Sequence, residues 1–367
     1  MATLTANDIV DLVAGTLLDL GPNKFSQIAQ ELQHYEVMGK WLKKDKMIFD
    51  DGRGIQRNLM SKLSNQAAHV GLTDTDNADI PDLMDQLNVP WRHAQTKWAF
   101  IYQTDILMNR GKSLIFNVVK PRRADAMISL AKELEAKAWV VPNTSNKTEP
   151  YGLPYYVVYN ATTGFTGTYP TGPDGTAHTT VAGVDLNDSP NFKNYSANYA
   201  AVSKTDLIKK MRTGHRKLGW MSPVTIDDYR GEMGQKLRIY TNETTVSSFE
   251  DLGESQNENL GRDVASMQAG GGKSSDVKDM DGQVTFRKIP IVWIPQLDDT
   301  AVFTACTNPV YLIDHSTFYP VCLKGDYLRE QKPEKAPNQH NVFRVFVDLS
   351  YNYLCVDRRR NAVFATA

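Results

Sequence analysis

The sequence has little cysteine and no long apolar run. Its 367 residues include three cysteines, Cys306, Cys322 and Cys355, which share no CxxC spacing. This excludes a complete disulfide framework and predicts a reducing environment. Each thiol lies in an apolar, strand-like stretch, so we expect buried and unreactive side chains rather than a nucleophile. No apolar run approaches the roughly 20 residues of a membrane span, and we therefore expect no membrane partner.

The sequence also has almost no net charge. Lys plus Arg number 41 and Asp plus Glu number 42, which gives a formal net charge of -1. This balance excludes a strongly basic nucleic-acid binder but leaves room for a local basic patch. Hydrophobic residues make up 41% and charged residues 23%, as in globular proteins. At roughly 100–200 residues per domain, the length predicts two or three domains.

No coherent catalytic pattern is present. The seven histidines show no HExxH spacing, and there is no Gly-X-Ser-X-Gly elbow. Two Gly-Lys-Ser triplets, at 111–113 and 272–274, lack the earlier glycine that a phosphate-binding loop requires. The pair Asp314–His315 could ligate a metal or orient a base, although a strand-end or surface pair is the simpler interpretation. We therefore predict no catalytic residues, no cofactor, no metal and no enzyme activity.

The N-terminal third indicates an arm followed by a long excursion. Helical spacing and capping residues predict a helix from Thr5 to Gly21, and a second short amphipathic stretch follows at about 25–37. Their apolar faces are small for an independent domain, so we expect residues 1–45 to dock on the body or on a neighbour. Residues 46–108 indicate an extended two-stranded excursion whose core is small for its length. Its ordering should therefore depend on partners.

The rest of the chain combines helices with many strands. One apolar stripe and a proline in the first turn predict a helix over 121–139. Aromatic and β-branched residues indicate a strand at 151–159, and a stretch rich in Gly, Thr, Pro, Asn and Asp indicates a surface insertion at 161–197. A capping box at Ser203–Asp206 predicts another helix. Further strands are expected at 236–240, 284–289, 291–294, 302–306, 342–347 and 350–356.

Three consecutive arginines follow the last of these strand patterns. If Arg358, Arg359 and Arg360 continued a strand, their side chains would point to alternating faces. At least one of them should then meet a partner or an acid beside the sheet. This pattern suits an assembly held by charge pairs as well as a phosphate site.

A series of short motifs occurs in order over about sixty C-terminal residues. They are Asn308-Pro-Val-Tyr-Leu-Ile-Asp314, Phe318-Tyr-Pro-Val-Cys-Leu-Lys-Gly325, Arg329-Glu330, Pro337-Asn-Gln-His340, Val347-Asp-Leu-Ser-Tyr-Asn352 and Arg358-Arg-Arg-Asn361. In this order they resemble the major capsid proteins of tailed bacteriophages with the Hong Kong 97-type coat fold. The rest of the chain is similar to that family in layout: an arm, an extended loop, a long helix and a β-rich second half.

The resemblance implies an α+β fold divided into five parts. These are an N-terminal arm at 1–45, an E-loop at 46–108, a P-domain at 109–200 with the helix 121–139 as its spine, an A-domain at 201–325, and C-terminal strands at 326–367 that return to the P-domain. The implied function is that of a coat protein forming the pentamers and hexamers of an icosahedral head. Such a head is assembled in the bacterial host cytoplasm and encloses double-stranded DNA in the virion.

The resemblance also implies partners. Besides other copies of the chain, these are a separate scaffold protein, a portal, non-specific contact with packaged DNA and, optionally, a decoration protein. Inter-subunit contacts are expected from charged residues of the excursion and of the C-terminal region: Arg53, Lys62, Asp79, Arg92, Arg329, Glu330, Arg358, Arg359 and Arg360. Some relatives crosslink their subunits through a Lys–Asn isopeptide bond, but the context of Lys62 does not identify it as such a residue.

Three alternatives remain open at this point. An encapsulin-like bacterial compartment shares the fold and would load protein cargo without packaged DNA. A metal-dependent enzyme would use Asp314, His315 and further acids, and would bind its metal as a monomer or small oligomer. A phage tail protein would form threefold or sixfold complexes rather than closed shells.

Overall fold

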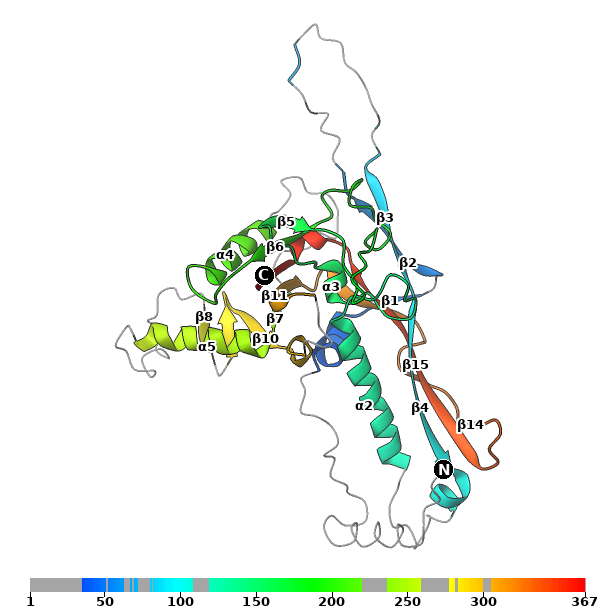
Figure 1. Cartoon of the computed structure of the whole chain (residues 1–367). Coiled ribbons are helices and arrows are strands. Elements are labelled where there is room, and N and C mark those ends of the chain that lie inside the picture. Colours follow the sequence, from blue (N-terminus) through cyan, green and yellow to red (C-terminus); the bar gives the residue numbers. More distant parts are fainter. Residues whose placement is uncertain are drawn as a thin grey trace.

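The protein is known from a computed structural model (Figure 1). The structure describes residues 35–50, 52–62, 67, 69–71, 80, 82–107, 119–219, 236–258, 277–280, 283–299 and 305–366. Two sheets form the body, and a hairpin, a long helix and a pair of long strands extend from it (Figure 1). The first predicted helix, both Gly-Lys-Ser triplets and Asp79 lie outside the described residues.

The first sheet has eight strands in the order β5-β6-β16-β11-β7-β10-β9-β8. They are β5 (Gly164–Gly167), β6 (Asn194–Asn198), β7 (Leu237–Thr241), β8 (Val277–Met280), β9 (Gln283–Phe286), β10 (Ile289–Trp293), β11 (Thr307–Asp314) and β16 (Ala362–Thr366). The final strand β16 pairs with β6 on one side and with β11 on the other. The sheet is therefore complete only when segments from the whole second half of the chain have come together.

Side chains of this sheet alternate between two cores. In β11, Val310 and Leu312 pack in one cluster, whereas Tyr311 and Ile313 pack in the other. This is the period of two that a strand imposes on its side chains. The helices α4 (Leu207–Leu218) and α5 (Glu243–Glu258) cover the Val310 face, α4 against β6 and β16 and α5 against β10 and β11.

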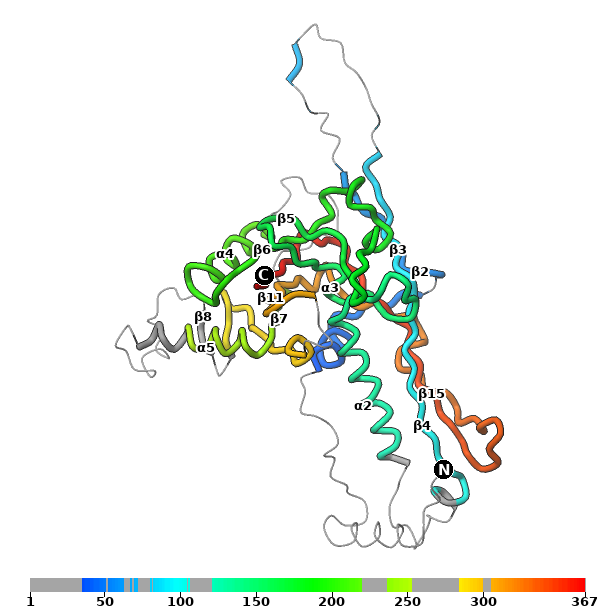
Figure 2. Tube along the Cα trace, viewed as in Figure 1, coloured from blue at the N-terminus to red at the C-terminus, as the bar shows by residue number. Residues whose placement is uncertain are grey.

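The second sheet has six strands arranged around one long strand. They are β1 (Met47–Phe49), β4 (Arg92–Ile101), β12 (Phe318–Leu323), β13 (Arg329–Glu330), β14 (Glu334–Lys335) and β15 (Val342–Cys355). Ten consecutive residue pairs join β15 to β4, and Figure 2 shows the two strands side by side over this length. The β15 side chains are fully buried from Leu349 onward but mostly half-buried before it, so its first part projects from the body.

A long helix and a short helical segment connect the two sheets. α2 (Val119–Ala138) packs against β4 and against η1 (Val37–Asp45), a π-helical segment. The apolar stripe of α2 is buried through Leu130, Leu134 and Ala138. η1 therefore contributes the N-terminal end of the described chain to the larger core.

A two-stranded hairpin begins and ends at the body. Its strands are β2 (Gly54–Met60) and β3 (Met84–Pro90), which pair in antiparallel register. Ile55 and Leu87 on one face are fully buried in the larger core, whereas the paired Met60 and Met84 are exposed. The remaining short elements are η2 (Tyr102–Leu107), α3 (Leu153–Tyr156), η4 (Pro295–Leu297) and η5 (Arg358–Arg360).

Several sequence predictions are confirmed. The helix expected at 121–139 is α2, displaced by two residues at its start and one at its end. The helix expected after Ser203 is α4, and the Ser203 hydroxyl accepts a hydrogen bond from the Asp206 amide at 3.2 Å. The two-stranded excursion is present as β2 and β3, although its return strand continues as β4 into the second sheet.

Other sequence predictions are wrong. Residues 151–159 contain the short helix α3 instead of a strand, because Pro154 suits a first helical turn and Tyr155 and Tyr156 are buried by tertiary contacts. Residues 161–197 are no surface insertion: they supply β5 and β6 and bury Val181 and Phe192. The strand expected at 302–306 lies largely outside the described residues.

The predicted domain boundaries do not coincide with the sheets. The eight-stranded sheet takes β6 from the stretch before residue 200 and β16 from the stretch after 325. β12, placed before 325, pairs with β15 in the other sheet. Of the C-terminal strands, β13, β14 and β15 are in the six-stranded sheet and β16 is in the eight-stranded sheet.

Candidate functional site

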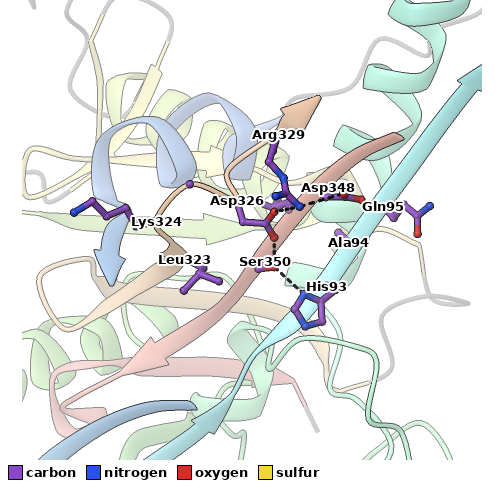
Figure 3. A pocket seen from close by; sticks show the side chains of 11 residues that line it. His93, Ala94, Gln95, Leu323, Lys324, Asp326, Arg329, Asp348 and Ser350 are labelled. Atoms are coloured by element: carbon purple, nitrogen blue, oxygen red, sulfur yellow. Dashed lines mark hydrogen bonds and ion pairs between the residues drawn. The ribbon is translucent and has the colours of Figure 1, made fainter. Parts of the chain in front are cut away.

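An open pocket lies between β4, β15 and the β12–β13 connection (Figure 3). Its volume is about 590 Å³, and its lining combines the apolar residues Ala94, Leu323 and Leu349 with charged and polar side chains. His93 Nδ1 lies 2.7 Å from Ser350 Oγ, and the Ser350 hydroxyl in turn donates to Asp326. Arg329 forms an ion pair with Asp326 at 3.0 Å and approaches Asp348 at 3.6 Å.

These groups do not form a catalytic triad. In a triad the histidine stands between the nucleophile and the acid, so that it can take the proton of the hydroxyl. Here Ser350 stands in the middle and gives its only proton to Asp326, and it therefore accepts from His93. Ser350 is also 1% exposed. The arrangement fixes the β12–β13 connection to β15 and β4, and we assign it no chemistry.

The junction of η1, α2 and the two sheets is an aromatic cluster. Trp41 is fully buried, and its ring lies 5.2 Å from that of Trp139 and 5.4 Å from that of Phe318. The Trp41 indole donates to the Tyr240 hydroxyl at 2.9 Å, and that hydroxyl lies 2.7 Å from His315 Nε2. The single residue Trp41 therefore ties η1 to α2, to β7 and to the strand end of β11.

Buried carboxylates surround this cluster. Glu135 of α2 accepts from the Val37 amide at 2.8 Å and from the Trp139 indole at 3.2 Å. The pKa of Glu135 is raised to about 7: burial and, to a smaller extent, the neighbouring charge of Glu36 raise it, and they outweigh the lowering effect of these hydrogen bonds. Glu36 pairs with Lys40 at 2.9 Å.

A second ion pair holds the far end of η1. Asp45 is paired with Arg238 of β7 at 2.8 Å, and the Arg238 guanidinium also lies 3.7 Å from Glu36. Arg238 therefore bridges Glu36, which immediately precedes η1, and Asp45, the last residue of η1. Such buried pairs cost much desolvation energy and are very sensitive to the loss of one partner.

The pair Asp314–His315 belongs to this junction and is no surface pair. Both residues are 1% exposed at the end of β11. Burial lowers the pKa of His315 well below its ordinary value, and the positive charge of Arg238 lowers it further, so the ring is neutral. Among the described residues no group of three or more His, Cys, Asp or Glu side chains could hold a metal ion.

Arg358 lies at the centre of a second polar cluster. It belongs to η5 rather than to a strand, because Asp357 caps that turn by accepting from the Arg359 amide at 2.9 Å. The guanidinium is fully buried, and burial lowers its pKa to about 10. Its acceptors are Tyr156 O at 2.6 Å, Phe192 O at 3.0 Å, Thr168 O at 3.0 Å, Gly167 O at 3.4 Å and Asn194 Oδ1 at 3.1 Å.

This geometry corrects the expectation for Arg358. Its side chain is saturated by backbone carbonyls of the segment 156–194 and is not available to another subunit. Arg360 is likewise 7% exposed and faces Asp314 at 3.8 Å and Asp357 at 3.8 Å. Of the three arginines only Arg359 is exposed, with its guanidinium 4.8 Å from the centre of the Phe165 ring.

The other predicted contact residues are scattered. Arg92 donates to the Lys147 carbonyl, and Glu330 accepts two hydrogen bonds from Arg123 of α2 at 2.7 and 3.1 Å. Arg53 is exposed at the start of β2, and Lys62 is half-buried just after its end. The structure therefore brings Arg329 and Glu330 together on β13, but it does not gather the predicted set into one site.

The three cysteines are shielded from solvent to different degrees. Cys322 and Cys355 are buried and Cys306 is partly buried, and burial raises the pKa of all three thiols. The expectation of unreactive thiols is consistent with this, because the thiolate is the reactive form.

Within the described part of the chain, no helix is long and apolar enough to cross a membrane.

Exposed apolar side chains are found mainly on the extensions. On the hairpin Met60 is 44% and Met84 54% exposed, and at the edge of the second sheet Ile48 of β1 is 54% exposed. Ile101 and Tyr102, at the outer end of β4, are also exposed. The hairpin and the projecting strands therefore present apolar surface at several separate places, a pattern that sequence reasoning located only by segment.

Comparison with known proteins identifies the fold. No protein-family model matches the chain, and no curated protein does. Among solved structures, the chain is similar to the subunit of the "Cyanophage A-1(L) capsid asymmetric unit", with 14% identity, a TM-score of 0.56, and 95% of this chain and 97% of that chain covered.

A second pair of structures gives the same result. The capsid of the native GTA particle matches with 11% identity and a TM-score of 0.53, over 99% of this chain and 100% of that one. The capsid of the empty GTA particle matches with 11% identity and a TM-score of 0.54, over 100% and 99%. Because coverage is nearly complete in both directions, the whole chain has the fold of a phage-type capsid subunit, with no large part left over.

Proposed function

We propose that the chain is the major capsid protein of a tailed phage, which self-assembles into pentamers and hexamers and forms the icosahedral head around double-stranded DNA. The observation that carries the proposal is the fold match over almost the full length of capsid subunits and of this chain. The layout agrees with it. The hairpin and the β4–β15 pair extend from the body and expose apolar side chains, which a single copy leaves in water.

The proposed partners follow from this function. Other copies of the chain are the principal partner. A separate scaffold protein, a portal and, optionally, a decoration protein would join during assembly, and contact with DNA would be independent of sequence. The mature site of action is the virion, after assembly in the host cytoplasm. Arg53, Lys62, Asp79, Arg92, Arg329, Glu330 and Arg359 remain proposed inter-subunit contacts; Arg53 and Lys62 flank β2, and Arg329 and Glu330 form β13.

Velocity sedimentation of the purified chain tests the proposal, with negative-stain imaging of any fast fraction. We expect uniform hollow particles, or rings that close when a scaffold is added. A chain that stays monomeric with and without scaffold would refute the proposal. Particles that contain protein cargo and no DNA when isolated from the cells that produce them would favour the encapsulin-like compartment instead.

A further inference from the structure

Two helices on the same face of the eight-stranded sheet carry charges of opposite sign. The sequence of α4 contains five Lys or Arg and no Asp or Glu, whereas α5 contains five Asp or Glu and no Lys or Arg. The whole chain is nearly neutral, with 41 bases and 42 acids, so this separation is a local feature. Figure 1 shows both helices at the same end of the molecule, remote from β4 and β15.

Each helix directs its apolar side toward the sheet. In α4, Ile208 and Met211 are buried, and Gly214 lies so close to β16 that an added Cβ would come within 2.8 Å of the Phe364 ring. In α5, Phe249 is buried in the same core. The charged residues Lys209 and Glu250 are exposed on the outward sides.

The outward charges have the same spacing on both helices. Lys209 and Arg216 are seven residues apart on α4, and Glu243 and Glu250 are seven residues apart on α5. All four are exposed. Seven residues are almost two helical turns, so each pair lies on one stripe with about 10.5 Å along the axis. Two helices laid side by side can therefore form two ion pairs at once.

Ordinary helix electrostatics account for only part of this distribution. Bases stabilise the C-terminal turn of a helix and acids the N-terminal turn. Arg216 in the last turn of α4 and Glu243 in the first turn of α5 follow this rule. Lys209, however, lies in the first turn of α4, while Glu254 and Glu258 lie toward the C-terminal end of α5. Neither Lys209 nor Glu250 has an ion pair within the described residues. The exposed side chains of Lys209 and Glu250 are therefore available to an oppositely charged helix that approaches from another copy.

We propose that α4 of one copy docks against α5 of the next copy, so that the acidic and basic helices meet head to tail around each ring of subunits. This inference rests on the proposed capsid function. A contact between two different faces of one chain closes into a ring when the rotation allows it, which is the geometry that pentamers and hexamers require. The charge pairs select the partner and fix the register, while apolar contacts elsewhere contribute most of the affinity.

A second copy fits these helices better than nucleic acid does. DNA would be attracted by α4 but repelled by the acidic α5 at the same end of the molecule. A second copy presents both signs and satisfies both helices. The acidic helix distinguishes these two possible partners. Reversing the charge of α5 should impair assembly only if α5 itself is part of the contact, as it is with a second copy.

Charge exchange between the helices is the test. The basic-helix variant is K209E/R216E, the acidic-helix variant is E243K/E250K, and the exchanged variant carries all four substitutions. All affected side chains are exposed, so we expect unchanged folding by circular dichroism and thermal unfolding. Each two-site variant alone should lose particle yield at least tenfold, and the exchanged variant should recover it. The control K204E alters the charge of the turn before α4 and should assemble like the wild type.

Mixing gives a second readout that only a head-to-tail contact produces. The two two-site variants carry like charges within one chain but complementary charges between chains. They should therefore form alternating rings, which can hold six subunits but not five. The expected result is hexamers without closed shells. The exchanged variant should also fail to enter wild-type particles.

Three outcomes would overturn the inference. Normal assembly of both two-site variants would show that the helices do not meet. Failure of the folded exchanged variant to recover would show the same. Loss of assembly or of DNA only in K209E/R216E, with E243K/E250K unaffected, would assign α4 to nucleic acid. A wild-type chain that forms no rings or shells would instead refute the proposed function, and the two failures are thus distinguishable.

Discussion

The Arg358 cluster and the β2–β3 hairpin differ in where their side chains find partners: inside the subunit for Arg358, and only partly so for the hairpin. Arg358 is a fully buried cation, and every hydrogen bond it donates is accepted within the same chain. The hairpin buries Ile55 and Leu87 but leaves Met60 and Met84 in water. The difference separates residues that make the subunit fold from residues available to another subunit. It also shows that a charged residue is a poor guide to an interface unless its own partners are known.

The largest expected effect falls on the Arg358 cluster. Replacing Arg358 by Ala removes the guanidinium donor from four backbone carbonyls of the segment 156–194 and leaves Asn194 Oδ1 with the Val158 amide as its donor. We expect a loss of about 3–5 kcal/mol in the free energy of unfolding, as for other buried charged networks that lose one partner. Urea unfolding of the unassembled chain measures it. R359A removes the exposed neighbouring arginine and should cost less than about 0.5 kcal/mol. Equal losses in both variants would contradict the assignment.

The sequence predicted what depends on local pattern. α2 and α4 are long enough for an apolar stripe to be recognised, and in both helices the stripe is the buried side. The excursion was also predictable, because 46–108 has few apolar residues and yet contains two alternating stretches. Resemblance in the C-terminal motifs indicated the fold family although overall identity to solved capsid subunits is only 11–14%.

What depends on distant contacts could not be predicted. The segment 161–197 is polar on average, but it is fixed by Arg358 and by the hydrogen bond from the Asn88 amide to the Ala182 carbonyl at 2.7 Å. Neither partner is near it in sequence. Arg358 itself was expected in a strand, because the capping contact of Asp357 is not distinguishable from a continuing β pattern. The burial of Asp314 and His315 likewise requires η1 to cover the end of β11.

An intermediate effect on the free energy of unfolding is expected at the junction of η1 and α2, where the buried Glu135 should make stability depend on pH. Because the pKa of Glu135 is raised to about 7 from an ordinary value near 4.5, the folded state holds this proton more tightly than the unfolded state does. The contribution of Glu135 to the free energy of unfolding is therefore fully present below about pH 4.5 and is lost as the pH rises through 7. We expect the loss to be roughly 2–3 kcal/mol by pH 8, measured by urea unfolding between pH 5 and pH 8.

The variant E135Q isolates that effect. The amide keeps one oxygen acceptor for Val37 or Trp139 but cannot ionise, so its stability should be nearly independent of pH in this range. It should be slightly less stable than the wild type at pH 5 and more stable at pH 8. E133Q, on the exposed side of the same helix, should follow the wild-type pH dependence. If E135Q keeps the full wild-type slope, the source of the pH dependence is another group.

The smallest effect on folding is expected from the exposed face of the hairpin, and there the comparison is most direct. M60T/M84T exchanges a cross-strand pair for β-branched residues that suit a strand. Since both methionines are exposed in the single copy, unfolding should change by less than about 0.5 kcal/mol. Assembly should nevertheless weaken, because we expect a neighbouring subunit to cover this exposed apolar surface. The matched variant I55V/L87V alters the buried face and should destabilise the chain by roughly 1–3 kcal/mol. Normal assembly of M60T/M84T would contradict this prediction, because it would show that the exposed pair has no role beyond its own subunit.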